Sequence, residues 1–292
     1  MINEQSGLAQ RQRLSAADVA AIHALADACN RHDGLDLKLN WDMLEERPGT
    51  DTDDFLFHQD GALIGYLGLY GFGRPILELN GMVHPDHRRE GIFSQLYAAA
   101  RVEAIARSIE SLLFICEPSS SGGQAFVRNL GAQYVFSEHK MVIPHPQRLV
   151  TGTSPIQLEQ VEAPTAQVAA SIHARAFDHP MQRSQHWIEQ YIQQPSRRAY
   201  LARLDTEPIG VIAVQSMPEE RFIYGFGVLA EQRGRGYGRQ ILATTINILV
   251  DQCDLPIMLE VETDNQRALG LYESCGFQQA ATYEYWRLAL VH

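Results

Sequence analysis

The stretch from Gly225 to Cys253 constrains the fold most, because three kinds of local structure follow one another in it. An apolar run with tyrosine and phenylalanine that ends at Val228 is typical of a strand. A cluster of arginine and glycine over residues 233–239 predicts a tight loop. Apolar side chains then recur at helical spacing, at Leu242, Ile246, Leu249 and Cys253. Because unpaired N–H groups and the positive end of the dipole lie where a helix begins, this glycine loop predicts a site for a phosphate-bearing ligand.

The spacing of the glycines narrows the kind of phosphate ligand. Glycines at 234, 236 and 238 do not give the G-x-G-x-x-G pattern of dinucleotide sites, and the Lys-Ser/Thr pair of a nucleoside-triphosphate loop is absent. The pattern Arg233-x-x-Gly236-x-Gly238 after a strand resembles the acyl-CoA pyrophosphate loop of the GCN5-related N-acetyltransferases (GNATs). A glycine-rich turn with a purely structural role would look similar, so a second motif is needed beside it.

Such a motif follows at Asn265-x-x-Ala268-x-x-x-Tyr272-x-x-x-Gly276-Phe277, shortly after a predicted strand at 257–262. It is similar to the second signature of the same family. The resemblance implies that acetyl-CoA is the cosubstrate. It also implies that the acceptor is an amine, which belongs either to a small molecule or to a peptide amino terminus.

Length and composition bound the class of protein. At 292 residues, with 45% hydrophobic and 20% charged residues, the chain has the composition of a globular protein of two domains. It contains no apolar run of membrane-spanning length, and its first residues lack the order of a signal peptide, so we expect a cytoplasmic protein with no membrane partner. The four cysteines are scattered in apolar surroundings, which favours reduced core residues, and we expect no metal site.

The charge balance bears on the partner. A net charge of −11 argues against nucleic acid, because phosphate backbones are bound by surplus lysine and arginine. Acidity favours a cationic acceptor only weakly, since solubility alone accounts for a charge of this size. The sequence does not indicate an oligomeric state.

The N-terminal half repeats the order of elements in the C-terminal half. In the N-terminal half we predict helices at 15–34, 93–104 and 123–130, and strands at 55–58, 62–69, 76–83, 112–116 and 134–143. In the C-terminal half we predict helices at 165–177, 186–193 and 238–253 and another from Asn265, and strands at 156–161, 199–204, 210–215, 221–229, 257–262 and 283–290. Equivalent loop arginines, Arg88 and Arg233, lie about 145 residues apart, which is the length of a whole domain.

This order predicts an α/β fold with mixed (α+β) sheets. We expect two tandem GNAT-like domains, 1–145 and 156–292, each a mixed central sheet flanked by helices. A breaker-rich linker at 146–155 joins them. Two such domains in one chain resemble the tandem acetyltransferases, a group that includes mycothiol synthase.

The two halves differ where the chemistry would take place. Aligning the glycines that end the second motif sets Val127 against Tyr272, so the N-terminal half lacks the phenol. Phe93 also stands where the other loop has Gly238. We therefore expect the N-terminal domain to be a noncatalytic copy in which cofactor binding is weakened but not excluded.

The resemblance assigns the cofactor-binding residues of the C-terminal domain. They comprise the strand end, the loop and the start of the next motif: Phe226, Gly227, Val228, Arg233, Gly234, Arg235, Gly236, Tyr237, Gly238, Arg239 and Asn265. In the family the strand splays from its neighbour here, and a backbone N–H of the strand stabilises the oxyanion of the reacting thioester. Glycines at 225 and 227 suit such a distortion.

Three side chains are candidates for proton transfer. Tyr272 is the candidate acid, because a phenol is protonated at neutral pH and the departing thiolate can accept its proton. The family resemblance gives Tyr272 the same role. Glu260 and Glu262 share one face of their strand and are candidate bases, acting directly or through water. The alternatives are a core tyrosine on an amphipathic helix and two carboxylates that face solvent.

The sequence therefore favours an N-acetyltransferase with its chemistry in the C-terminal domain. Two alternatives remain open. One is a noncatalytic acyl-CoA-binding sensor, which binds acetyl-CoA without turnover, and the other is an interaction protein in which both sites are vestigial. Retention of Tyr272 and of the full loop in one half, beside their erosion in the other, argues against both.

Overall fold

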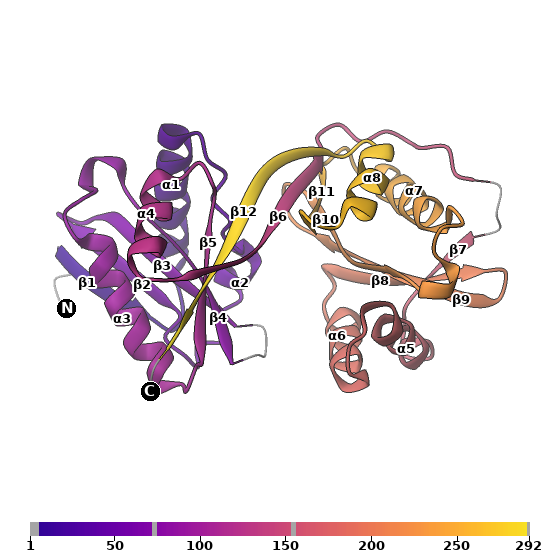
Figure 1. Ribbon diagram of the computed structural model, residues 1–292, viewed down its shortest axis with the longest axis horizontal. Coiled ribbons are helices and arrows are strands. Elements are labelled where there is room, and N and C mark those ends of the chain that lie inside the picture. The colour runs from indigo at the N-terminus through magenta and orange to yellow at the C-terminus, as the bar shows by residue number, and fades with distance from the viewer. Residues whose placement is uncertain (1–5, 72–74, 153–155, 291–292) are drawn as a thin grey trace. The chain divides into compact units, whose positions relative to one another are not determined.

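The computed structural model describes residues 6–71, 75–152 and 156–290. The chain forms two compact units: unit 1 consists of Met1–Glu138 together with Ala281–His292, and unit 2 consists of His139–Ala280 (Figure 1). The sheet strands of each unit are mixed parallel and antiparallel and have helices on both faces, which confirms the predicted fold class. Within the described ranges, no helix has the length and apolar character needed to cross a membrane.

Unit 1 is built on a sheet with the strand order β1-β2-β3-β4-β5-β12. Its elements are β1 (Ser6–Arg11), α1 (Ala16–Asp33), α2 (Trp41–Glu45), β2 (Asp54–Gln59), β3 (Ala62–Gly71), β4 (Ile76–Val83), α3 (Ile92–Ala106), β5 (Ser111–Cys116), α4 (Ser121–Asn129), the first part of β6 (Gln133–Ile143) and most of β12 (Gln278–Ala289). β4 and β5 are parallel, whereas β12 runs antiparallel to β5. Ser15 begins α1 with a capping box, in which its Oγ accepts from Asp18 N and the Asp18 carboxylate accepts from Ser15 N.

Unit 2 has the strand order β6-β11-β10-β9-β8-β7. Its further elements are β7 (Ile156–Gln160), α5 (Ala166–Phe177), α6 (Met181–Gln193), β8 (Arg197–Leu204), β9 (Glu207–Ser216), β10 (Arg221–Val228), α7 (Tyr237–Val250), β11 (Ile257–Glu262) and α8 (Gln266–Ser274). β10 and β11 are parallel, and β7 to β10 pair antiparallel in succession.

Alternation along the strands places a separate core on each face of each sheet. In unit 1, Leu67 packs with α3, whereas its neighbour Tyr66 packs with α1 on the other face. In unit 2, Ile212 packs with α7 and α8, whereas Val211 packs with α5 and α6. The helices that follow the two glycine loops, α3 and α7, therefore cover equivalent faces.

The ends of the two units differ from the sequence expectation of domains at 1–145 and 156–292. Residues 281–292 belong to unit 1, where β12 pairs with β5 from Glu284 to Ala289. In turn, Met141 and Ile143 of β6 pack in the core of unit 2. Both strands are long and alternate between apolar and polar residues, so the sequence pattern alone does not determine which sheet each one completes.

The segment expected as a linker at 146–155 is partly fixed. The main-chain N–H of Leu149 donates to Asn247 Oδ1 (2.7 Å), and Asn247 Nδ2 donates back to the Leu149 carbonyl (2.9 Å). These two hydrogen bonds attach the segment to α7, because the Asn247 side chain pairs with both main-chain groups of Leu149. Residues 153–155 lie outside the described residues, and β1 and α2 are elements that the sequence did not predict.

Candidate functional site

The loop between β10 and α7 has the backbone of an anion site. Gly234 and Gly236 adopt left-handed conformations, with φ of 79° and 80°. Gly236 is the N-cap of α7, and no side chain caps the helix. The first N–H groups of α7 are therefore left without a side-chain acceptor, and they meet the positive end of a 14-residue helix.

Arg233 holds this loop in place. Its Nε donates to the Val228 carbonyl (2.8 Å), and its Nη2 donates to the Ala176 carbonyl near the end of α5 (2.9 Å). These bonds join the loop to β10 and α5, so the guanidinium positions the loop. Arg239 donates to the Val150 carbonyl (3.3 Å), and Arg235 is exposed.

β10 separates from its neighbour where the cofactor is expected. It pairs with β11 at Arg221 and Phe222, and its register with β9 shifts between Tyr224 and Gly227. Gly225 lies inside this bulge with a φ of 56°, which glycine adopts without strain. The strand end from Phe226 to Val228 is thus released from parallel pairing, as the resemblance implied.

An aromatic wall from α5 and α6 covers the bulge. A Cβ on Gly225 would collide with the Trp187 ring, and one on Gly227 would lie 2.8 Å from the Phe177 ring. The Trp187 ring stacks on His173 (centroids 4.2 Å apart, interplanar angle 21°), and His173 Nδ1 lies 2.9 Å from Ser184 Oγ. Burial lowers the pKa of His173 to about 4, so this imidazole is neutral at physiological pH. The sequence signalled this wall only through the small residues at 225 and 227.

Tyr272 lies on α8 with its side chain largely enclosed. It is 9% exposed, and its ring meets Phe277 edge to face at 6.0 Å. Burial raises the pKa of Tyr272 to about 12, so the phenol keeps its proton over the whole physiological range. Its neighbour Leu271 lies 3.4 Å from the place a Cβ of Gly238 would take, which puts α8 beside the start of α7.

The remaining predicted residues lie on β11 and at the start of α8. Asn265 is the N-cap of α8, and its Oδ1 accepts from Ala268 N (3.2 Å). Glu260 is half-buried and Glu262 is exposed, on the face of β11 opposite the buried Leu259. The structure therefore brings together the loop, the bulged strand and the phenol within unit 2.

Unit 1 repeats the loop geometry with different side chains. Arg89 and Gly91 have φ of 69° and 80°, matching Gly234 and Gly236, and Gly91 is the N-cap of α3. Arg88 donates to the Val83 carbonyl (3.1 Å), as Arg233 does to Val228, but its Nη atoms form two bonds to Asp33 (2.8 and 2.6 Å). These bonds from Arg88 lower the pKa of Asp33.

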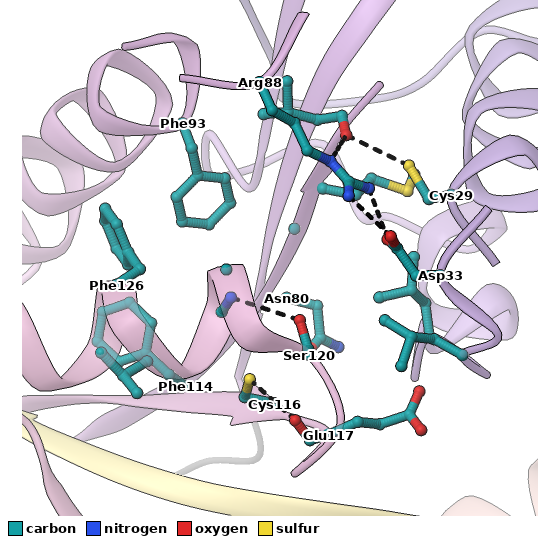
Figure 2. Close-up of a pocket in the computed structure, with 18 of the residues that line it drawn as sticks. Cys29, Asp33, Asn80, Arg88, Phe93, Phe114, Cys116, Glu117, Ser120 and Phe126 are labelled. Carbon is teal, nitrogen blue, oxygen red and sulfur yellow. Dashed lines mark hydrogen bonds and ion pairs between the residues drawn. The ribbon is translucent and has the colours of Figure 1, made fainter. Parts of the chain in front are cut away.

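Unit 1 also contains a cavity of about 710 Å³ where β4 and β5 separate (Figure 2). The two strands pair only from Ile76 to Leu79 of β4, and the cavity extends from there to the loop and the start of α3. Phe93 lies against Gly81, since a Cβ there would be 2.7 Å from its ring. In unit 2 the positions are exchanged: Phe226 on the strand faces Gly238 on the helix. The Phe93 ring on α3 therefore fills in unit 1 the space that the Phe226 ring on β10 fills in unit 2, and it leaves the loop open.

Comparison with known proteins defines the class. The model of the Acetyltransferase (GNAT) family matches residues 20–132 and 166–277, so the chain belongs to this family and is an acetyltransferase with two GNAT domains in tandem. The chain is 29% identical to the mycothiol acetyltransferase of Kineococcus radiotolerans over 284 residues, which cover 90% of each chain. It is 28% identical to the enzyme of the same name from Streptomyces griseus, again over 90% of each chain.

Solved structures share the fold. A GCN5-related N-acetyltransferase from Sphaerobacter thermophilus superposes with a TM-score of 0.80 at 18% identity, over 100% of this chain and 98% of the other. A tandem GNAT protein from the clavulanic acid biosynthesis pathway gives a TM-score of 0.75 at 20% identity, over 98% and 99% of the two chains. Both likenesses support the tandem arrangement.

Proposed function

We propose that unit 2 transfers the acetyl group of acetyl-CoA to the amine of a small molecule, with a peptide amino terminus as the alternative acceptor. The main observation behind this proposal is that unit 2 combines an uncapped helix start, a bulged strand and a buried phenol. Relatives named mycothiol acetyltransferase support an acceptor related to mycothiol. Four free cysteines support a reducing, cytoplasmic setting.

Each part of unit 2 has a separate task. The N–H groups from Gly234 to Arg239 hold the pyrophosphate, and the released main chain from Phe226 to Val228 aligns the thioester arm and polarises its carbonyl. Tyr272 donates its proton to the departing thiolate of CoA. Its raised pKa keeps the proton available, while Glu260 or Glu262 accepts the proton of the attacking ammonium.

Unit 1 has a binding-only function in this account. Its loop has the same backbone as the loop of unit 2, and its cavity offers room beside α3 for an acyl-CoA. Val127 takes the place of the phenol, so no acid stands ready for the thiolate. We therefore propose that unit 1 binds acyl-CoA without turnover.

A screen of amines, with release of CoA thiol as the readout, tests the proposed function. At least one amine related to the mycothiol precursor should give turnover that depends on Tyr272. Acetyl-CoA binding without turnover on any amine would favour the sensor alternative. Absence of acetyl-CoA binding in calorimetry would favour an interaction protein.

A further inference from the structure

Asn80 carries a buried hydrogen-bond donor that no other described residue satisfies. The residue is 4% exposed and lines the unit 1 cavity, and its Nδ2 makes no hydrogen bond. Met82, two residues along β4, packs with α1, so alternation places the Asn80 amide on the same side, where Cys29 and Asp33 line the cavity (Figure 2). A buried N–H without an acceptor is costly, and an acceptor atom of a bound ligand would remove this cost.

The position of Asn80 in the repeat indicates which acceptor. Asn80 stands in unit 1 where Gly225 stands in unit 2. In unit 2 this position lies in the bulge against β9, on the part of β10 that no longer pairs with β11 and that is expected to meet the thioester carbonyl. In unit 1 the register of β4 with β3 runs unbroken, with Asn80 opposite Gly68. Unit 1 therefore presents a side-chain amide at the level where unit 2 distorts its backbone.

The other end of the cavity suits an anion. Gly91 begins α3, a helix of 15 residues, without a side-chain cap, and the first residues of α3 line the cavity. A ligand that spans the cavity thus carries a phosphate at one end and a carbonyl at the other.

Building on the proposed binding of acyl-CoA by unit 1, we propose that Asn80 Nδ2 donates a hydrogen bond to the thioester carbonyl oxygen. Unit 1 thereby distinguishes acylated from free coenzyme A. CoA thiol has no oxygen at this place, so its binding leaves the amide buried and unpaired. Unit 1 is then a reader of the acylation state of the carrier, in which no bond forms or breaks.

Calorimetry on the full chain with Gly238→Asp, which weakens the unit 2 site, tests this role. The probes are acetyl-CoA, CoA thiol and S-ethyl-CoA, a thioether of similar size that lacks the carbonyl oxygen. The unit 1 site should bind acetyl-CoA about 5- to 100-fold more tightly than S-ethyl-CoA, which is the range expected for leaving a buried donor unpaired. Adding Asn80→Leu should bring the two affinities within about twofold of each other.

A second variant distinguishes loss of the Asn80 donor from misfolding of the protein. Asn80→Ser is smaller and keeps a donor, so it should retain part of the preference for acetyl-CoA, while circular dichroism checks that both variants are folded. An undiminished preference in folded Asn80→Leu, or equal affinities for all three probes in the parent chain, would overturn the assignment of Asn80. A failed amine screen with this preference intact would instead overturn the proposed function of unit 2 alone.

Discussion

The loops before α3 and α7 have the same backbone conformation in the two units but carry different side chains. Both loops place left-handed residues at the same two positions, although unit 1 uses Arg89 where unit 2 uses Gly234. The exchange of Gly81 and Phe93 for Phe226 and Gly238 then keeps one aromatic ring between strand and helix in each unit. The backbone shape of this loop therefore tolerates large changes of side chain, because main-chain groups form it.

The proposed chemistry of unit 2 depends on features that unit 1 lacks. Unit 2 has a phenol on α8 and a bulge in β10, whereas unit 1 has Val127 and an unbroken β4 at the same positions. The comparison suggests that binding and turnover can be lost separately within one fold.

The largest effect is expected from Tyr272→Phe. The substitution keeps the ring and its contact with Phe277 and removes only the hydroxyl, so acetyl-CoA affinity should remain. Turnover, measured as release of CoA thiol at saturating acetyl-CoA, should fall about 10²- to 10⁴-fold, the usual contribution of a positioned acid. Tyr200→Phe removes another hydroxyl from the same core and is the matched control. Full activity of Tyr272→Phe from pH 6 to 9 would remove the phenol from the mechanism.

The largest loss of stability is expected when a buried ion pair of unit 1 is broken. Arg47 donates twice to Asp54 (2.9 and 3.1 Å), Tyr66 donates to the same carboxylate (2.8 Å), and Arg47 and Asp54 are 5% and 0% exposed. Asp54→Asn removes the closer counter-charge of the guanidinium and leaves only Asp53, 3.6 Å away, so it should lower the free energy of unfolding by about 3 kcal/mol.

An exposed pair in unit 2 provides the control for this prediction. Arg175 and Glu231 form an ion pair on the surface, with side chains about half exposed. Glu231→Gln should change the free energy of unfolding by less than about 1 kcal/mol. Urea denaturation measures both changes, and losses of equal size would contradict the account.

The phosphate loop of unit 2 should show an intermediate effect. Gly238→Asp sets a carboxylate beside the bound pyrophosphate, so acetyl-CoA binding to unit 2 should weaken by about 1.5–3 kcal/mol. Gly91→Asp sets a carboxylate at the N-cap of α3, the position equivalent to Gly236, and should weaken only the unit 1 site. Calorimetry resolves the two sites, and the same loss at both sites from either variant would show that the sites are not separate.

A further prediction concerns pH. The pKa of His173 is about 4 in the folded protein, below the ordinary value of 6.5, and His179 and Arg183 add to the effect of burial. Below pH 6.5 the unfolded chain gains a proton that the folded chain refuses, so stability should fall between pH 6.5 and 4. His173→Gln should flatten this part of the stability profile in urea titrations. An unchanged slope would show that His173 is protonated in the folded state.

The sequence predicted most elements, because their signals are local. The Ser15 cap, the glycines at the start of α7 and the alternation along the strands each act within a few residues. The place of β12 could not be predicted, since β6 and β12 carry similar patterns and only packing decides between the sheets. The unpaired amide of Asn80 and the Trp187 wall depend on contacts between distant segments. The sequence showed that Phe93 stands where the other half has Gly238, but only the structure shows that the Phe93 ring packs against Gly81.

A single-turnover experiment tests the division of labour most directly. The full chain is loaded with acetyl-CoA labelled in the acetyl group and then mixed with an accepting amine and excess unlabelled acetyl-CoA. The account predicts two labelled acetyl groups bound per chain and one transferred to the amine, with the second released into the unlabelled pool. Transfer of both acetyl groups, or transfer of one that persists undiminished in Tyr272→Phe, would contradict it.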